Sequence, residues 1–170
     1  WSNPPALAAA EAHHRVSLFT VDLDNNGPPD LVASADNATA IWLNQGGARF
    51  TRLEHTPALF VTSVADVDGD GLLDLVGLTG TGAAVAHTHG SKGYHWQSIQ
   101  ARARSNADGR INTYGIGGRI EVRAGPLLAM APITAPTTHF GLGENPQVGV
   151  ARIVWPNGVA QVEFGLQPNQ

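Results

Sequence analysis

The sequence predicts an all-β fold, because turn residues are frequent and helix signals are scarce. Of the 170 residues, 20 are Gly and 11 are Pro, and only residues 4–13 could form a short helix. Asn157 and Gly158 stand between two alternating apolar runs, which is the strongest local signal for a β-hairpin. Short apolar runs bounded by turn residues also recur in a repeated segment of the first half, which adds a third reason to expect strands.

This repeated segment organises the first half of the chain. Residues 19–32 align with residues 63–76 at an offset of 44, and both copies end in Asp-Leu-Val. Each copy is followed by a short apolar run and a Gly-rich turn. A repeat of about 40–50 residues that contains several short strands is typical of propeller blades. The first half therefore predicts two propeller-type repeats.

From about residue 94 the pattern changes to strands without acidic loops. The expected strands cover residues 116–122, 127–133, 148–155 and 159–164. We expect a repeat region over 1–93 and a small β-sandwich-like domain over 94–170.

The charge of the chain is concentrated in two short windows, residues 22–30 (the first loop) and residues 66–74 (the second loop). The net charge is −4, with 14 acidic residues in all, and half of these lie in the two loops. They are Asp22, Asp24, Asp30, Asp66, Asp68, Asp70 and Asp74. Such local acidity favours metal ligands, and the absence of a basic patch argues against nucleic acid as a partner. No apolar run approaches the roughly 20 residues of a membrane-spanning helix, and the sequence has no Cys for disulfides or thiolate ligands.

The second loop has the spacing of a calcium site. Its expected ligands are the side chains of Asp66, Asp68, Asp70 and Asp74 and the carbonyl oxygen of Leu72. Alternate residues of a tight loop can turn their carboxylates to a common centre, and Gly71 permits the sharp bend. With water, about 6–7 hard oxygen ligands suit Ca²⁺. Four carboxylates this close would repel one another without a cation.

The first loop repeats the arrangement with one carboxylate fewer. Its expected ligands are the side chains of Asp22, Asp24, Asn26 and Asp30 and the carbonyl oxygen of Pro28. Fewer charges predict weaker Ca²⁺ binding, which the rigid Pro28-Pro29 pair partly offsets. The sequence thus predicts two Ca²⁺ sites.

Other interpretations of the acidic loops and of nearby histidines compete with this one. An EF-hand needs Glu at loop position 12 and flanking helices, but Ala33 and Gly77 stand there and both flanks have strand patterns. Solvated acidic turns without an ion, or loops that bind Mg²⁺ or Mn²⁺, are the remaining alternatives. His87 and His89 share one face of an expected strand and with His95 could bind Zn²⁺, although ordinary strand side chains are the commoner case.

The two loops with their trailing Asp-Leu-Val resemble the FG-GAP/VCBS repeats of integrin-α-like β-propellers. Residues 44–50, Asn-Gln-Gly-Gly-Ala-Arg-Phe, are similar to the turn that often closes such a blade. The second half resembles the ASPIC/UnbV domain of cartilage-acidic-protein-like chains. The similar stretches are residues 95–96, 105–109, 115–125, 138–143 and 153–158. The resemblance implies an extracellular, calcium-stabilised protein used for adhesion or binding, with its Ca²⁺ ligands at the loop positions given above.

Residues and resemblance together predict a secreted or cell-surface, calcium-binding structural or adhesion module that is not an enzyme. The alternative is a calcium-dependent, lectin-like protein whose partner is a glycan, because bound Ca²⁺ can chelate sugar hydroxyls. Two repeats are fewer than the roughly 4–8 blades that close a propeller. Exposed strand edges are therefore expected to pair with another copy of the chain or with the rest of a longer parent chain.

Overall fold

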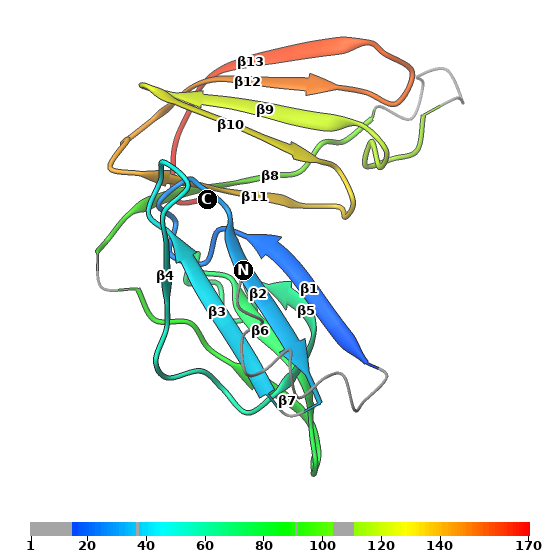
Figure 1. Ribbon diagram of the computed structural model, residues 1–170. Coiled ribbons are helices and arrows are strands. Elements are labelled where there is room, and N and C mark those ends of the chain that lie inside the picture. The colour runs from blue at the N-terminus through cyan, green and yellow to red at the C-terminus, as the bar shows by residue number, and fades with distance from the viewer. Residues whose placement is uncertain (1–14, 37, 91, 104–110) are drawn as a thin grey trace. The chain divides into compact units, whose positions relative to one another are not determined.

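The structure is a computed structural model that describes residues 15–36, 38–90, 92–103 and 111–170 (Figure 1). These residues form strands and turns, and the predicted all-β fold is confirmed for them. Within these ranges there is no helix long and apolar enough to cross a membrane. The short helix considered for residues 4–13 lies outside the described residues.

The chain divides into two compact units, which are described separately. Unit 1 contains the chain up to Asp24 together with Pro28–Lys92. Unit 2 contains Asn25–Gly27 and Gly93–Gln170, so the tip of the first loop is grouped with the second unit.

Unit 1 contains two antiparallel sheets. The first has the order β1-β2-β3-β4, with β1 at Val16–Val21, β2 at Asp30–Ala35, β3 at Ala38–Asn44 and β4 at Phe50–Arg52. The second has the order β5-β6-β7, with β5 at Phe60–Ala65, β6 at Asp74–Thr79 and β7 at Gly82–Ala86. The first loop joins β1 to β2, and the second loop joins β5 to β6 (Figure 1).

The two sheets of unit 1 repeat one strand register. Val21 pairs with Asp30 at the base of the first loop, and Ala65 pairs with Asp74 at the base of the second. The β2–β3 and β6–β7 hairpins match at the same offset. Adding 44 to both residue numbers of a β2–β3 pair gives a β6–β7 pair. The sequence repeat is therefore also a structural repeat.

A common core joins the two sheets of unit 1 and supports both loops. Its buried side chains are Leu23, Val32, Ile41, Leu59, Val61 and Leu75. The hydroxyl of Ser34 donates to the carbonyl of Leu59 and accepts from the amide of Val61, both at 2.9 Å. Thr39 donates to the same Leu59 carbonyl at 2.6 Å. These bonds pair buried polar groups and hold the start of β5 against the first sheet.

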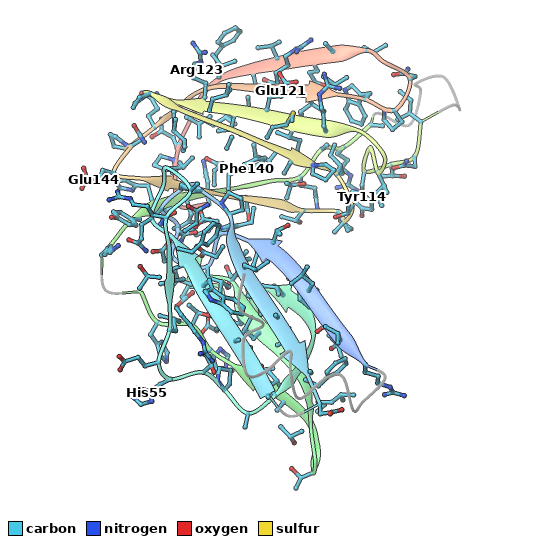
Figure 2. All side chains as sticks on the ribbon, viewed as in Figure 1. His55, Tyr114, Glu121, Arg123, Phe140 and Glu144 are labelled. Atoms are coloured by element: carbon cyan, nitrogen blue, oxygen red, sulfur yellow. The ribbon has the colours of Figure 1, made fainter. Side chains whose placement is uncertain are left out.

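Unit 2 consists of a four-stranded and a two-stranded antiparallel sheet. The larger sheet has the order β10-β9-β12-β13, with β9 at Arg119–Ala124, β10 at Leu127–Pro132, β12 at Val148–Val154 and β13 at Ala160–Leu166. The smaller sheet pairs β8 at His95–Ile99 with β11 at Thr138–Gly143. Side chains from both sheets form one core, and Figure 2 shows Phe140 of β11 between them.

Turn chemistry explains where two predicted strands of unit 2 begin or end. The Asn157-Gly158 turn joins β12 to β13 as predicted, with Gly158 at φ 86° and its amide donating to Trp155 at 2.8 Å. The strand predicted to start at residue 116 is wrong by three residues, because β9 starts at Arg119. A turn occupies the preceding residues, where the amide of Gly118 donates to the carbonyl of Gly115 at 2.9 Å.

Candidate metal centre

Both loops turn sharply because two residues in each have a left-handed backbone. At the sixth position φ is 104° for Gly27 and 86° for Gly71, which supports the role predicted for these glycines. At the fourth position φ is 58° for Asn25 and 80° for Gly69. The bend at the fourth position was not predicted from the sequence, although Asn and Gly are the residues that tolerate such a conformation best.

The last aspartate of the second loop is buried and anchors the backbone around it. Asp74 is 0% exposed. Its Oδ2 accepts a hydrogen bond from the amide of Val67 at 3.0 Å, and its Oδ1 accepts one from the amide of Thr88 at 2.9 Å. One carboxylate therefore ties the start of the loop to the end of the following hairpin. A carboxylate oxygen has lone pairs enough to accept such a bond and also to ligate an ion.

The first loop has the same anchor 44 residues earlier. Asp30 is 1% exposed, and its carboxylate accepts from the amide of Leu23 at 2.8 Å and from the amide of Asn44 at 2.7 Å. The side chain of Asn44 also donates to the carbonyl of Pro29, just as Thr88 donates to Leu73 in the second repeat. A ligand role alone was predicted for the two final aspartates, and this anchoring role was not predicted.

Three carboxylates of the second loop lie close enough to share one ion. Asp66, Asp68 and Asp70 each offer an oxygen atom, and these atoms lie within 4.8 Å of one another. Because Ca²⁺ binds oxygen at about 2.4 Å, oxygens at such separations can contact a common ion. Both oxygens of Asp66 also accept backbone bonds, from Gly69 at 2.8 Å and Gly71 at 3.0 Å. These bonds fold the loop back on its own carboxylates, so the donor set fits a hard divalent cation.

The first loop brings together a different trio. Asp22, Asp24 and Asp30 offer oxygens within 4.8 Å of one another, so here the buried final aspartate belongs to the group. The ammonium of Lys92 lies 3.8 Å from Oδ2 of Asp24. The ligand roles predicted for the Asn26 side chain and for the Pro28 and Leu72 carbonyls stay predictions.

Burial makes the charged form of one carboxylate in the first loop unfavourable. Burial raises the pKa of Asp30 from its ordinary value of 3.8 to about 6, and the carboxylate of Asp24 adds to this rise. The amides of Asn44 and Leu23 act in the opposite direction but do not cancel the effect of burial. A divalent ion would favour the charged form of Asp30.

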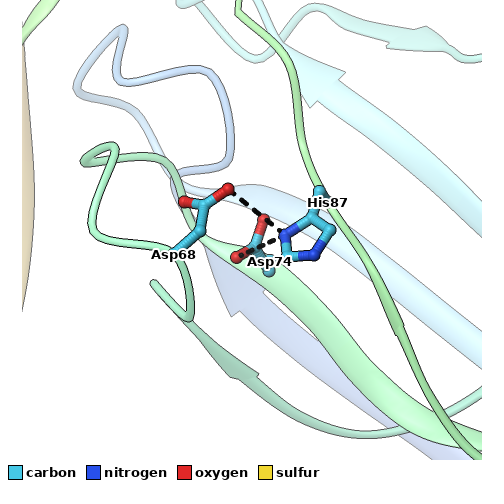
Figure 3. Close-up of side chains that lie close together, drawn as sticks. All are labelled: Asp68, Asp74 and His87. Atoms are coloured by element: carbon cyan, nitrogen blue, oxygen red, sulfur yellow. Dashed lines mark ion pairs between the residues drawn. The ribbon is translucent and has the colours of Figure 1, made fainter.

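A histidine side chain from the following hairpin lies beside the second loop. Leu75 of β6 pairs with Ala86 of β7, so the next residues outward, Asp74 and His87, lie across from each other. Nδ1 of His87 lies 3.3 Å from Oδ2 of Asp74 and 3.4 Å from Oδ2 of Asp68 (Figure 3).

This grouping differs from the zinc site considered for His87, His89 and His95. His95 belongs to unit 2, where Nδ1 of its ring contacts the side-chain amide of Asn169 at 3.2 Å. The three-histidine site therefore stays a prediction. The approach of His87 to Asp68 and Asp74 was not predicted from the sequence, and the β6–β7 hairpin register was the signal that could have shown it.

Comparison with known proteins identifies the repeat region. A family model described as FG-GAP-like repeat matches residues 22–77, a range that begins at Asp22 and takes in both loops. Comparison with curated proteins finds none that matches the chain. The family match ends before Gly93, so the resemblance of the second half to ASPIC/UnbV domains and to cartilage-acidic-protein-like chains gains no support and stays a prediction. Residues 22–77 thus carry an FG-GAP-like repeat, which fits an adhesion-like β module of the kind typical of extracellular and cell-surface proteins.

Proposed function

We propose that unit 1 is a calcium-stabilised structural or adhesion module of an extracellular or cell-surface protein. The observation that carries the proposal is the repeated loop. In each copy, three aspartates offer oxygens within 4.8 Å of one another, and the same backbone bonds anchor the final aspartate. Solvated acidic turns without an ion would not explain why the aspartate trio and the anchoring bonds both occur twice.

The ion would be held by oxygen donors in both loops. The residues that would hold it are Asp22, Asp24, Asn26, Asp30 and the Pro28 carbonyl, and Asp66, Asp68, Asp70, Asp74 and the Leu72 carbonyl. When bound, Ca²⁺ supplies positive charge that offsets carboxylate repulsion. Its binding free energy then adds to the free energy of unfolding, because the unfolded chain has no such site.

Thermal unfolding of the full chain in EDTA and in about 1 mM calcium chloride tests this proposal. If that concentration is about ten times Kd, each site adds about 1.4 kcal/mol, and two sites raise the unfolding midpoint by roughly 5–10 °C. Magnesium chloride at the same concentration should restore less of the midpoint, since Mg²⁺ demands a smaller octahedral site.

Matched variants locate the effect. Asp66→Asn and Asp22→Asn each remove one charge and keep an oxygen, so each should lower the calcium-dependent shift. Asp36→Asn alters an exposed aspartate outside both loops and should leave the shift unchanged. Equal midpoints in EDTA and in calcium chloride would contradict the proposal.

The partners predicted for the chain stay predictions. In unit 1 the strands β1, β4, β5 and β7 lie at sheet edges, each with a neighbour on one side within its sheet. Such edges favour pairing with another copy or with a longer parent chain. Glycan binding and the absence of enzymatic activity likewise stay predictions.

A further inference from the structure

We propose that Asp68, Asp74 and His87 form a mixed nitrogen and oxygen site that binds a divalent transition ion, with Zn²⁺ as the best fit. The inference rests on the proposed metal-binding role of the second loop and adds a second class of ion to it. Asp68 belongs both to this trio and to the acidic trio with Asp66 and Asp70.

The distances in the trio fit ligands of one small ion. Zn²⁺ binds nitrogen and oxygen at about 2.0–2.1 Å in a tetrahedron, which places neighbouring ligand atoms about 3.3–3.4 Å apart. Nδ1 of His87 lies 3.3 Å from Oδ2 of Asp74 and 3.4 Å from Oδ2 of Asp68 (Figure 3). A direct hydrogen bond between imidazolium and carboxylate would be shorter, at about 2.7–2.9 Å. One oxygen of each carboxylate and the imidazole nitrogen all lie within 4.8 Å of one another, so one small ion could contact all three atoms.

Backbone bonds hold the two carboxylates in place. Asp74 is fully buried and accepts from the amides of Val67 and Thr88. Oδ1 of Asp68 accepts from the amide of Asp70 at 3.2 Å, which directs Oδ2 to His87. Hydrogen bonds of this kind orient metal ligands and raise affinity. His87 and Asp68 are 43% and 41% exposed, so an ion and a water molecule can reach the open side.

The imidazole decides which ion this trio prefers. Ca²⁺ takes oxygen ligands, whereas imidazole nitrogen suits Zn²⁺ and its transition-metal neighbours. Because Asp68 and Asp74 are also proposed calcium ligands, the transition ion would compete with calcium for the second loop.

The first loop offers an internal control. Its residue at the position of His87 is Leu43, which packs against the core of unit 1. The scaffold is the same in both repeats, but this nitrogen donor is present in the second only. Replacing His87 by Leu therefore converts one repeat to the chemistry of the other at this position.

Isothermal titration of zinc chloride into the tag-free full chain in calcium-free buffer tests the inference, because bound calcium would compete for Asp68 and Asp74. The unmodified chain and His89→Leu should bind Zn²⁺ with equal affinity. His87→Leu should weaken that binding by at least about tenfold. Replacing Zn²⁺ by Co²⁺ should give visible absorption bands in the unmodified chain that His87→Leu loses.

His87→Gln keeps a polar side chain and serves if His87→Leu does not fold, as judged by circular dichroism. The inference is overturned if the unmodified chain binds no Zn²⁺, or if the His87 variants bind it as tightly as the unmodified chain. Failure of the calcium proposal has a different signature, because it removes the calcium-dependent midpoint shift and leaves the loss of Zn²⁺ binding in His87→Leu intact.

Discussion

The first and second loops share one scaffold and differ in the groups around it. In each loop a buried aspartate, Asp30 or Asp74, accepts backbone amides from the start of the loop and from the end of the next hairpin. The surrounding side chains are not repeated, since His87 contacts the second loop and Lys92 contacts the first. The same anchoring bonds therefore recur in both repeats, while the side chains that surround each loop differ.

The largest expected effect comes from breaking that common scaffold. Asp74→Ala leaves the buried amides of Val67 and Thr88 without their acceptors, which should lower the free energy of unfolding by about 2–5 kcal/mol. Asp30→Ala should cause a similar loss. Urea denaturation in EDTA measures both without any contribution from bound metal.

Asp68→Ala is the control for this pair, because Asp68 is exposed and its loss leaves the buried anchor intact. It should change stability in EDTA by less than about 1 kcal/mol. If Asp74→Ala were no more destabilising than Asp68→Ala, the anchors would not be what the two repeats have in common.

A pH dependence of the first loop is the next largest effect. The folded pKa of Asp30, about 6, lies above its ordinary value of 3.8, so the folded state holds this proton more tightly than the unfolded chain. The stability contributed by protonation is complete below pH 4 and is lost as the pH rises through about 6. In EDTA this loss should reach at most about 3 kcal/mol between pH 4 and pH 7.

Asp30→Asn isolates the titration of Asp30. The free energy of unfolding of the variant is subtracted from that of the unmodified chain at each pH, which cancels the contributions of all other residues. Glu121, whose pKa is lowered by hydrogen bonds from Arg119 and Arg152, contributes with the opposite sign and cancels in the difference. Calcium chloride should reduce the dependence, since the ion favours the carboxylate form. A difference that stays flat over this pH range would contradict the assigned cause.

Local features of the loops could be predicted from the sequence, and features set by strand pairing could not. The left-handed bend at Gly71 and the alternating Asp66, Asp68 and Asp70 depend on neighbouring residues only. The contact of His87 with Asp74 depends on the β6–β7 register, which places residues 13 positions apart opposite each other. The anchoring role of Asp74 likewise needs Thr88, which lies beyond the hairpin.

The smallest predicted effect concerns Lys92 and the first loop. Its ammonium lies 3.8 Å from Oδ2 of Asp24, is half exposed, and has no lone pair with which to ligate an ion. It therefore opposes a bound cation by repulsion worth about 1 kcal/mol or less at this exposure. Lys92→Gln should raise calcium affinity at the first loop by up to about fivefold, with a smaller gain in high salt.

Titration of calcium into Lys92→Gln on an Asp66→Asn background measures the first loop with the second loop weakened. Lys92→Arg keeps the positive charge and should bind calcium like the unmodified residue on that background. If Lys92→Arg raised the affinity as much as Lys92→Gln, charge would not be the cause. If Lys92→Gln lowered the affinity, Lys92 would be supporting the loop. A gain that vanishes on an Asp22→Asn background would show that neighbouring side chains tune each loop separately.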